Sequence, residues 1–256
     1  MQTNPTIFKA YDIRGIYKKD LDEKTAYDLG LAYVELRKKD LKKNNSAKKL
    51  KIIVGSDMRI SSPSLKKHLI KGLLDAGVDV SDIGTTSTPT FYFAVANYKY
   101  DGGIMVSASH NPKEWNGFKI TRERAIPISG NTGIEFLKEK IISGNLIKSK
   151  TKGKLNKKKN VLKDQIKHDL KHGNIKKIKP LKIVVDPANA VGGLFINELF
   201  KYLPGKLIKI NFKLDGNFPA HEADPIKEEN LEQIKKEVIK QKADLGITTD
   251  GDGDRI

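Results

Sequence analysis

Short apolar runs that end in glycine or polar residues alternate with segments of helical spacing, and this rhythm limits the possible folds more than any other feature. In the first half of the chain the strand-like runs are residues 51–55, 78–84 and 103–106. Ser62-Pro63 opens a stretch of leucines at helical spacing, and Thr88-Pro89 leads into the apolar segment 91–98. Strands that alternate with helices predict a parallel sheet, and ligands gather beyond the carboxyl ends of such strands.

The same alternation starts again in the second half of the chain. Strand-like runs occupy residues 182–186, 207–210 and 244–249, and helical patterns occupy about 191–202 and 229–241. We expect two consecutive α/β domains with mixed, mostly parallel sheets and helices on both faces. We place the first domain at residues 1–147 and the second at 148–256, because the lysine-rich stretch 148–159 indicates an exposed connection.

Length and composition limit the class of protein. A chain of 256 residues can bury two cores. It contains no cysteine, which excludes disulfides and thiolate metal sites. No apolar run approaches the roughly 20 residues of a membrane span, and the first residues do not resemble a signal peptide. We expect a soluble, cytoplasmic protein with no membrane partner.

The formal net charge of +17 comes almost wholly from lysine. A positive field attracts anions, and sugar phosphates qualify as well as nucleic acids do. A compositional bias with a solvated lysine surface would produce the same charge. Aromatic stacking platforms interleaved with basic residues are not evident, so we expect small sugar phosphates and no nucleic acid as partners.

The most specific local pattern is DGDGDR at residues 250–255, in which Asp250, Asp252 and Asp254 alternate with glycines or an arginine. Two like charges about 4 Å apart repel by about 4 kcal/mol at an effective dielectric near 20. Such crowding predicts a divalent cation, and an all-oxygen ligand set favours Mg²⁺ with a phosphate oxygen as a further ligand. A calcium EF-hand fails, because Arg255 stands where that loop needs glycine. A polar turn without a metal is the alternative.

The segment SASHNP at residues 107–112 follows the strand-like run 103–106 and offers a nucleophile. Ser109 and Ser107 are both candidates, because alternate residues of an extended segment point to the same side. His110 is a candidate for phosphate binding or proton transfer, and Lys119 for a charge partner or an acid/base group. The alternative is an ordinary turn built by Asn111-Pro112.

Two of the few arginines suggest phosphate contacts. In a lysine-rich chain, Arg14 and Arg255 indicate a need for the planar guanidinium fork that binds phosphate through paired hydrogen bonds. Arg59 is interpreted differently, because Asp57 lies two residues before it and the pair can brace its own loop.

Taken together, these segments resemble the α-D-phosphohexomutase family, most closely its phosphomannomutase/phosphoglucomutase branch. The matching segments are FKAYDIRG at 8–15, GSDMRISS at 55–62, DIGTTSTPT at 82–90, SASHNP at 107–112, NGFK at 116–119, DGNFP at 215–219 and DGDGDR at 250–255. The opening YDIRG differs from the GTDGIRG-like start of the phosphoglucosamine mutase branch.

The resemblance implies a role for each candidate residue. Ser109 would be the phosphoserine and would share Mg²⁺ with Asp250, Asp252 and Asp254, while Ser107 would be loop framework. The residues expected to contact phosphate, aid proton transfer or border the site are Tyr11, Arg14, His110, Asn111, Lys119 and Arg255. The implied reaction interconverts hexose 1-phosphate and hexose 6-phosphate of mannose or glucose, through a hexose 1,6-bisphosphate intermediate that also serves as activator.

The chain departs from the family in length. Family members continue for two further domains that carry a sugar-recognition loop and a phosphate-gripping loop, whereas this sequence ends at Ile256. We therefore expect the 256-residue chain alone to be inactive or very poorly active, because binding energy from the distal phosphate drives catalysis. The alternative is a non-catalytic relic or interaction module that retains the fold and the metal site.

Overall fold

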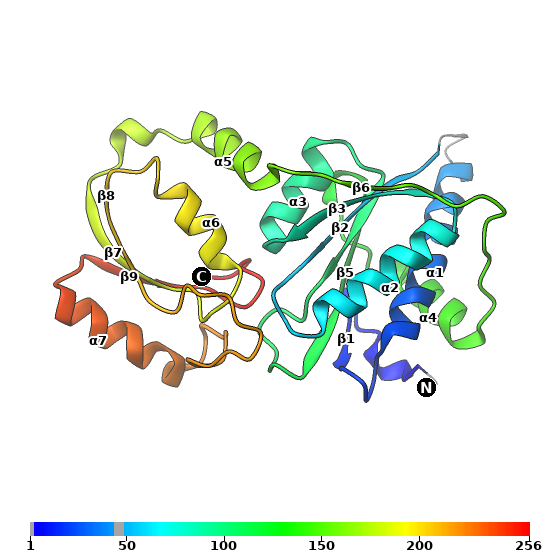
Figure 1. Ribbon diagram of the computed structural model, residues 1–256, viewed down its shortest axis with the longest axis horizontal. Coiled ribbons are helices and arrows are strands. Elements are labelled where there is room, and N and C mark those ends of the chain that lie inside the picture. Colours follow the sequence, from blue (N-terminus) through cyan, green and yellow to red (C-terminus); the bar gives the residue numbers. More distant parts are fainter. Residues whose placement is uncertain (1–2, 44–48) are drawn as a thin grey trace.

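The computed structural model describes residues 3–43 and 49–256, which form two sheets with their helices (Figure 1). We call the contact region between them, where Ser109 meets Asp250, the seam. The first sheet has the order β1-β5-β4-β2-β3-β6, and the second has the order β8-β7-β9. We call the described residues from 3 to 157 the first unit and residues 181–256 the second unit.

The first sheet is parallel at its centre and antiparallel toward one edge. Its strands are β1 (Asp12–Ile16), β2 (Lys51–Ser56), β3 (Asp79–Thr85), β4 (Gly102–Val106), β5 (Trp115–Arg122) and β6 (Leu155–Lys157). β2 pairs in parallel with β3 and β4, whereas β5 returns antiparallel to β4 and also pairs with β1. The loop from β4 to β5 therefore leaves the sheet at the carboxyl ends of the parallel strands.

Helices cover both faces of the first sheet. Along β2, Ile52 and Val54 pack into the large core with α1 (Glu23–Lys43), α2 (Ser62–Asp75) and α4 (Ile134–Ser143). Ile53 points to the opposite face, where it packs with Phe91 of α3 (Thr88–Asn97). This division follows from the strand geometry, which sends alternate side chains to opposite faces.

The second unit repeats the parallel pattern on a smaller scale. Its strands are β7 (Leu181–Asp186), β8 (Gly205–Lys209) and β9 (Leu245–Thr248), and β7 pairs in parallel with both neighbours. Figure 1 shows α6 (Gly192–Leu199) and α7 (Glu232–Gln241) on opposite sides of these strands. Between the units, α5 (Val161–His172) lies against α3, where the Tyr98 hydroxyl donates to Asp164 at 2.5 Å.

The prediction of two α/β units with mixed, mostly parallel sheets and helices on both faces is confirmed. The prediction omits β1, β5, β6, α1, α4 and α5. Alternating strands and helices indicate only parallel units, and β5 follows β4 with no helix between them. The segment 148–159 is largely exposed, as expected, but residues 155–157 also form the edge strand β6 beside β3. The boundary between residues 147 and 148 stays a prediction.

Candidate functional site

Two loops meet at the seam between the units, and both leave the carboxyl ends of parallel strands. One follows β4 and carries Ser109, and the other follows β9 and carries Asp250. The Ser109 hydroxyl donates to Asp250 Oδ2 at 2.6 Å. The backbone of Gly251 lies directly against the Ser109 carbonyl, where a side chain would collide with that oxygen. Glycine between the aspartates is therefore what allows the two loops to touch.

The two serines of the first loop occupy different positions. Ser109 is buried and has φ 53°, in the left-handed region that costs a non-glycine residue energy. Its backbone N–H donates to the Ser107 hydroxyl at 3.0 Å. The Ser107 side chain thus braces the loop, while the Ser109 hydroxyl faces the acidic cluster.

Asp250, Asp252 and Asp254 form a cluster in which one carboxylate oxygen from each lies within 4.8 Å of the others. Asp250 and Asp252 are fully buried. Burial, together with the neighbouring charge of Asp252, raises the pKa of Asp250 to about 6. Asp252 Oδ1 is buried without a hydrogen-bond partner. A buried carboxylate oxygen is rarely left unpaired, and the all-oxygen donor set suits a divalent cation such as Mg²⁺.

Two cations lie against this cluster. Lys119 Nζ is 2.5 Å from both Asp252 Oδ2 and Asp254 Oδ2. Burial alone would lower the pKa of Lys119, but the two aspartates raise it above its ordinary value. Arg255 Nη2 donates to the Ser109 hydroxyl at 2.7 Å and to Asp250 Oδ2 at 3.0 Å. Two cations thus lie beside three carboxylates and offset only part of their negative charge.

The remaining predicted residues surround the Ser109 loop with different degrees of contact. Arg255 Nη2 also contacts His110 Nδ1. Burial of the imidazole and, to a smaller extent, the positive charge of Arg255 lower the pKa of His110. Arg14 Nη1 donates to Asn111 Oδ1 at 2.8 Å. Tyr11 lies just before β1 and is 71% exposed. The structure thus brings together all of the predicted site residues except Tyr11, whose side chain makes no hydrogen bond to the described residues.

Thr88 contacts the acidic cluster from the first unit, although no sequence pattern predicts a role for it at the site. Its hydroxyl donates to Asp252 Oδ2 at 2.5 Å, and its backbone N–H donates to the Asp252 carbonyl at 2.8 Å. Thr88 carries no charge and begins α3, so it has the features of an ordinary helix start. The one sequence feature that could have indicated a role for Thr88 was its place in DIGTTSTPT, a segment that matches the family. The interpretation of Arg59 is confirmed, because Arg59 Nε donates to Asp57 Oδ2 at 3.1 Å.

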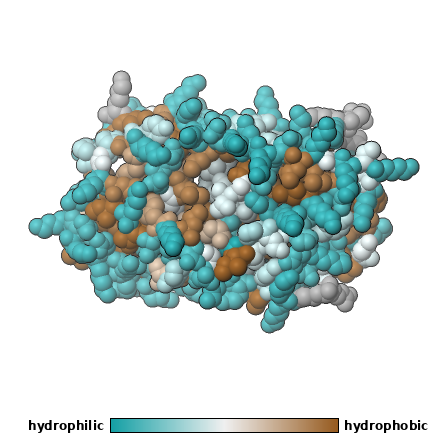
Figure 2. Space-filling model, viewed as in Figure 1, coloured by the Kyte–Doolittle hydropathy of each residue, from teal (hydrophilic) through white to brown (hydrophobic). Residues whose placement is uncertain are grey.

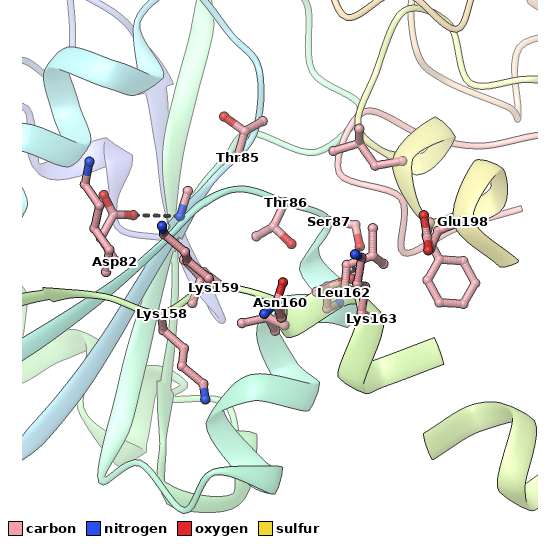
Figure 3. Close-up of a pocket in the computed structure, with 17 residues that line it drawn as sticks. Asp82, Thr85, Thr86, Ser87, Lys158, Lys159, Asn160, Leu162, Lys163 and Glu198 are labelled. Atoms are coloured by element: carbon pink, nitrogen blue, oxygen red, sulfur yellow. Dashed lines mark hydrogen bonds between the residues drawn. The ribbon is translucent and has the colours of Figure 1, made fainter. Parts of the chain in front are cut away.

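A cavity of about 540 Å³ lies next to this site (Figure 3). The β3–α3 turn, the segment from Lys157 to Lys163 and part of α6 line it. Ser87 lines the cavity, whereas the next residue, Thr88, reaches the acidic cluster. The cavity includes none of the residues that the sequence predicts for catalysis or metal binding.

Comparisons with known proteins match both units to one family. Residues 5–144 match the model of phosphoglucomutase/phosphomannomutase, alpha/beta/alpha domain I, and residues 162–256 match alpha/beta/alpha domain II. None of the helices in the described part of the chain is long and apolar enough to cross a membrane.

Individual relatives cover nearly all of this chain. It is 40% identical over 255 residues to a phosphomannomutase of Vibrio cholerae, covering 98% of this chain and 54% of the relative. A phosphomannomutase/phosphoglucomutase of Pseudomonas syringae is 39% identical, with 98% and 51% covered. A crystal structure of a phosphoglucomutase/phosphomannomutase family protein from Burkholderia thailandensis superposes with a TM-score of 0.87 at 35% identity, covering 99% of this chain and 54% of that one. The chain thus spans about half the length of these relatives.

Proposed function

The chain belongs to the phosphoglucomutase/phosphomannomutase family, and from that premise we propose that it is the part of a phosphohexomutase that carries the phosphoserine and the metal site. The proposed reaction interconverts the 1-phosphate and 6-phosphate of mannose, glucose or both. One observation carries the proposal: the Ser109 hydroxyl lies 2.6 Å from Asp250 Oδ2, in a cluster of three aspartates of which Asp250 and Asp252 are buried.

The residues that would hold Mg²⁺ are Asp250, Asp252, Asp254 and a phosphorylated Ser109. The unpartnered Asp252 Oδ1 supports this assignment, because an ion would satisfy it. The cation would offset negative charge on the phosphoryl oxygens during transfer. Arg255 already touches the Ser109 hydroxyl and would help to orient the phosphoryl group.

The proposed chemistry is two phosphoryl transfers of opposite direction. First, the bond from phosphorus to Ser109 Oγ breaks while a bond from a sugar hydroxyl oxygen to phosphorus forms. The hydroxyl proton passes to a base, for which His110 is the candidate by position, whereas Lys119, protonated beside Asp252 and Asp254, would contact phosphate or act as the acid. The bisphosphorylated sugar then reorients, the bond between phosphorus and its other sugar oxygen breaks while Ser109 Oγ bonds to that phosphorus, and the proton returns to the released sugar oxygen. Arg14 and Asn111, which are bonded to each other beside this loop, would contact phosphate, and Tyr11 would border the site.

We further propose that the 256-residue chain alone converts mannose 1-phosphate very slowly or not at all. The relatives are about twice as long, and the family resemblance assigns the loops that bind the sugar and its distal phosphate to the remaining part. Without those contacts, remote binding energy cannot hold the sugar in its reactive position. Rapid conversion of mannose 1-phosphate to mannose 6-phosphate by the purified chain would contradict this.

Mapping of phosphorylation sites tests the proposal directly. We would incubate the purified chain with Mg²⁺ and glucose 1,6-bisphosphate and locate phosphate by tandem mass spectrometry. We expect phosphate on Ser109, none in Ser109→Ala, and continued labelling of Ser109 in Ser107→Ala. Phosphate on Ser107 would reverse the assignment of the two serines. A wild-type chain that takes up no phosphate at all would favour the relic that keeps only the fold.

A further inference from the structure

Arg59 gathers the backbone of the Ser109 loop around one buried charge. Its side chain is fully buried. Its guanidinium donates to four carbonyls: Ser109 at 2.8 Å, Asn111 at 2.6 Å, Pro112 at 2.6 Å and Trp115 at 3.1 Å. Hydrogen bonds from a charged donor are stronger than neutral ones. Four backbone carbonyls of the loop from Ser109 to Trp115 therefore bond to the same buried cation.

The GSDMRISS segment holds that cation in one orientation. Asp57 Oδ2 accepts from Arg59 Nε at 3.1 Å, and Asp57 Oδ1 accepts from the Arg59 backbone N–H at 3.0 Å. The Ser62 hydroxyl also donates to Asp57 Oδ1, at 2.5 Å. A buried ion pair needs such additional hydrogen bonds to balance its loss of hydration. Arg59 cannot move without breaking this set, so its position defines the position of the Ser109 carbonyl.

The second unit closes over Arg59 with the DGNFP segment, to which neither the resemblance nor the proposed reaction gives a role. The Phe218 ring centre lies 5.0 Å from Arg59 Cζ, within the range of a cation–π contact. Gly216 packs against the same loop, because a Cβ there would lie 2.6 Å from the Ile60 nitrogen and 2.8 Å from the Met58 oxygen. Phe218 itself has φ 51° and donates its N–H to the Asp215 carbonyl at 3.1 Å.

We propose that Arg59 is a positioning residue for Ser109 and that Phe218 makes this positioning depend on the docking of the second unit. This inference deepens the proposed function and rests on it for its catalytic meaning. Ser109 sits in a left-handed conformation that the surrounding contacts must maintain. The second unit supplies two of those contacts, Phe218 over Arg59 and Gly251 against the Ser109 carbonyl. The serine thus reaches its position only when the acidic cluster is also docked.

Hydrogen exchange on the intact 256-residue chain tests the positioning without using catalysis. We would compare wild type with Phe218→Leu and with Phe212→Leu, a matched control, because Phe212 is also in the second unit but stacks beside Lys209 instead of Arg59. We expect Phe218→Leu to speed exchange of the amides in residues 107–116 by about tenfold, in keeping with a cation–π contact. Exchange in α1 and α2 should not change. Equal exchange of residues 107–116 in the two variants would overturn the proposal.

Phosphorylation of Ser109 by glucose 1,6-bisphosphate gives the second readout. Because a small misplacement of reacting groups lowers rates by one to two orders of magnitude, we expect Phe218→Leu to slow labelling at saturating donor by about tenfold. The donor concentration for half-maximal rate should change little. Phe218→Tyr should restore the rate because it keeps the ring. Arg59→Lys should be slower still, because lysine lacks the planar fork that binds several carbonyls.

The two readouts separate the possible failures. If the wild-type chain takes no phosphate on Ser109, the proposed function is contradicted, whereas the exchange comparison still decides whether Phe218 and Arg59 hold the loop. If Phe218→Leu does not give a native circular dichroism spectrum, Phe218→Met replaces it in both experiments. Normal labelling in a folded Phe218→Leu chain would show that the stack does not position Ser109.

Discussion

The two units of this protein contribute one loop each to the site, but they are built very differently. The first unit has a continuous apolar core that joins three helices to its sheet. In the second unit the small apolar cluster of Ala188, Ala190 and Ala223 is completed by Met58 from the first unit. Large apolar side chains of the second unit stay exposed, among them Ile239 at 78%. Figure 2 shows such apolar patches over the second unit, on the left.

The same contrast appears in the two loops. The Ser109 loop wraps around Arg59, which belongs to its own unit. The acidic loop is held across the seam, because Thr88 and Lys119 of the first unit contact Asp252. The first unit is thus stabilised by its core, whereas the acidic loop of the second unit, although hydrogen-bonded within itself, also depends on contacts across the seam.

Removing core volume from the first unit should have the largest effect. Leu69 in α2 is fully buried, so Leu69→Ala should lower the free energy of unfolding by about 2–5 kcal/mol. Ile234→Ala in α7 is the matched change in the second unit, and we expect a smaller loss with faster exchange confined to residues 181–256. Urea denaturation with hydrogen exchange measures both. Equal losses spread over the whole chain would contradict the division into a core-stabilised and a docked unit.

Removing a proposed metal ligand should weaken cation binding without harming the first unit. Mutation of a residue that only hydrogen-bonds to a metal ligand already lowers metal affinity by about 10–100-fold. We therefore expect Asp252→Asn to weaken Mn²⁺ binding, measured by isothermal titration calorimetry, by more than about 100-fold. Asp244→Asn is the control, because Asp244 belongs to the second unit but lies outside the cluster. Unchanged affinity in Asp252→Asn would remove the cluster as a cation site.

Changing the seam contact alone should give an intermediate effect. Thr88→Val keeps the side-chain shape but removes the hydroxyl that donates to Asp252. We expect Mn²⁺ affinity to fall by about tenfold, the lower end for outer partners of metal ligands. The exposed Thr85 provides the matched control, Thr85→Val. If both variants bind Mn²⁺ like wild type, the acidic loop does not depend on the first unit for its geometry.

The smallest expected effect is a pH dependence within the second unit. A hydrogen bond to Asp186 raises the pKa of His221 above 6.5, although burial opposes it. A raised folded-state pKa stabilises the fold fully below the unfolded value, and this stabilisation is lost as the pH rises through the folded value. After correction for the intrinsic exchange rates, hydrogen exchange of residues 181–256 should therefore become faster as the pH rises from about 6 to 8. In His221→Gln this trend should disappear, and a persistent trend would assign it to another group.

Much of the fold and of the candidate site could be predicted from local patterns. The strands at β2, β4, β7 and β9 and the loops that follow them are each encoded within a few residues. The aspartates 250, 252 and 254 could be found because clustered carboxylates are costly without a partner. The role of Thr88 and the bonds from Arg59 to the Ser109 loop could not, because a threonine at a helix start and an arginine near an aspartate are common. Their contacts involve residues 50 or more positions away.

The sequence by itself determined which segments form parallel α/β units and which residue types stand at the ends of their strands, because periodicity and charge are local properties. From the residue pattern alone, Ser107 and Ser109 were equally good candidates for the nucleophile. Only the tertiary structure decided that the Ser109 hydroxyl faces Asp250 and that Ser107 braces the loop. The physical reason is that the left-handed turn at Ser109 is held by Arg59 of its own unit and by Gly251 of the second unit, and both contacts join residues that only the folded chain brings together.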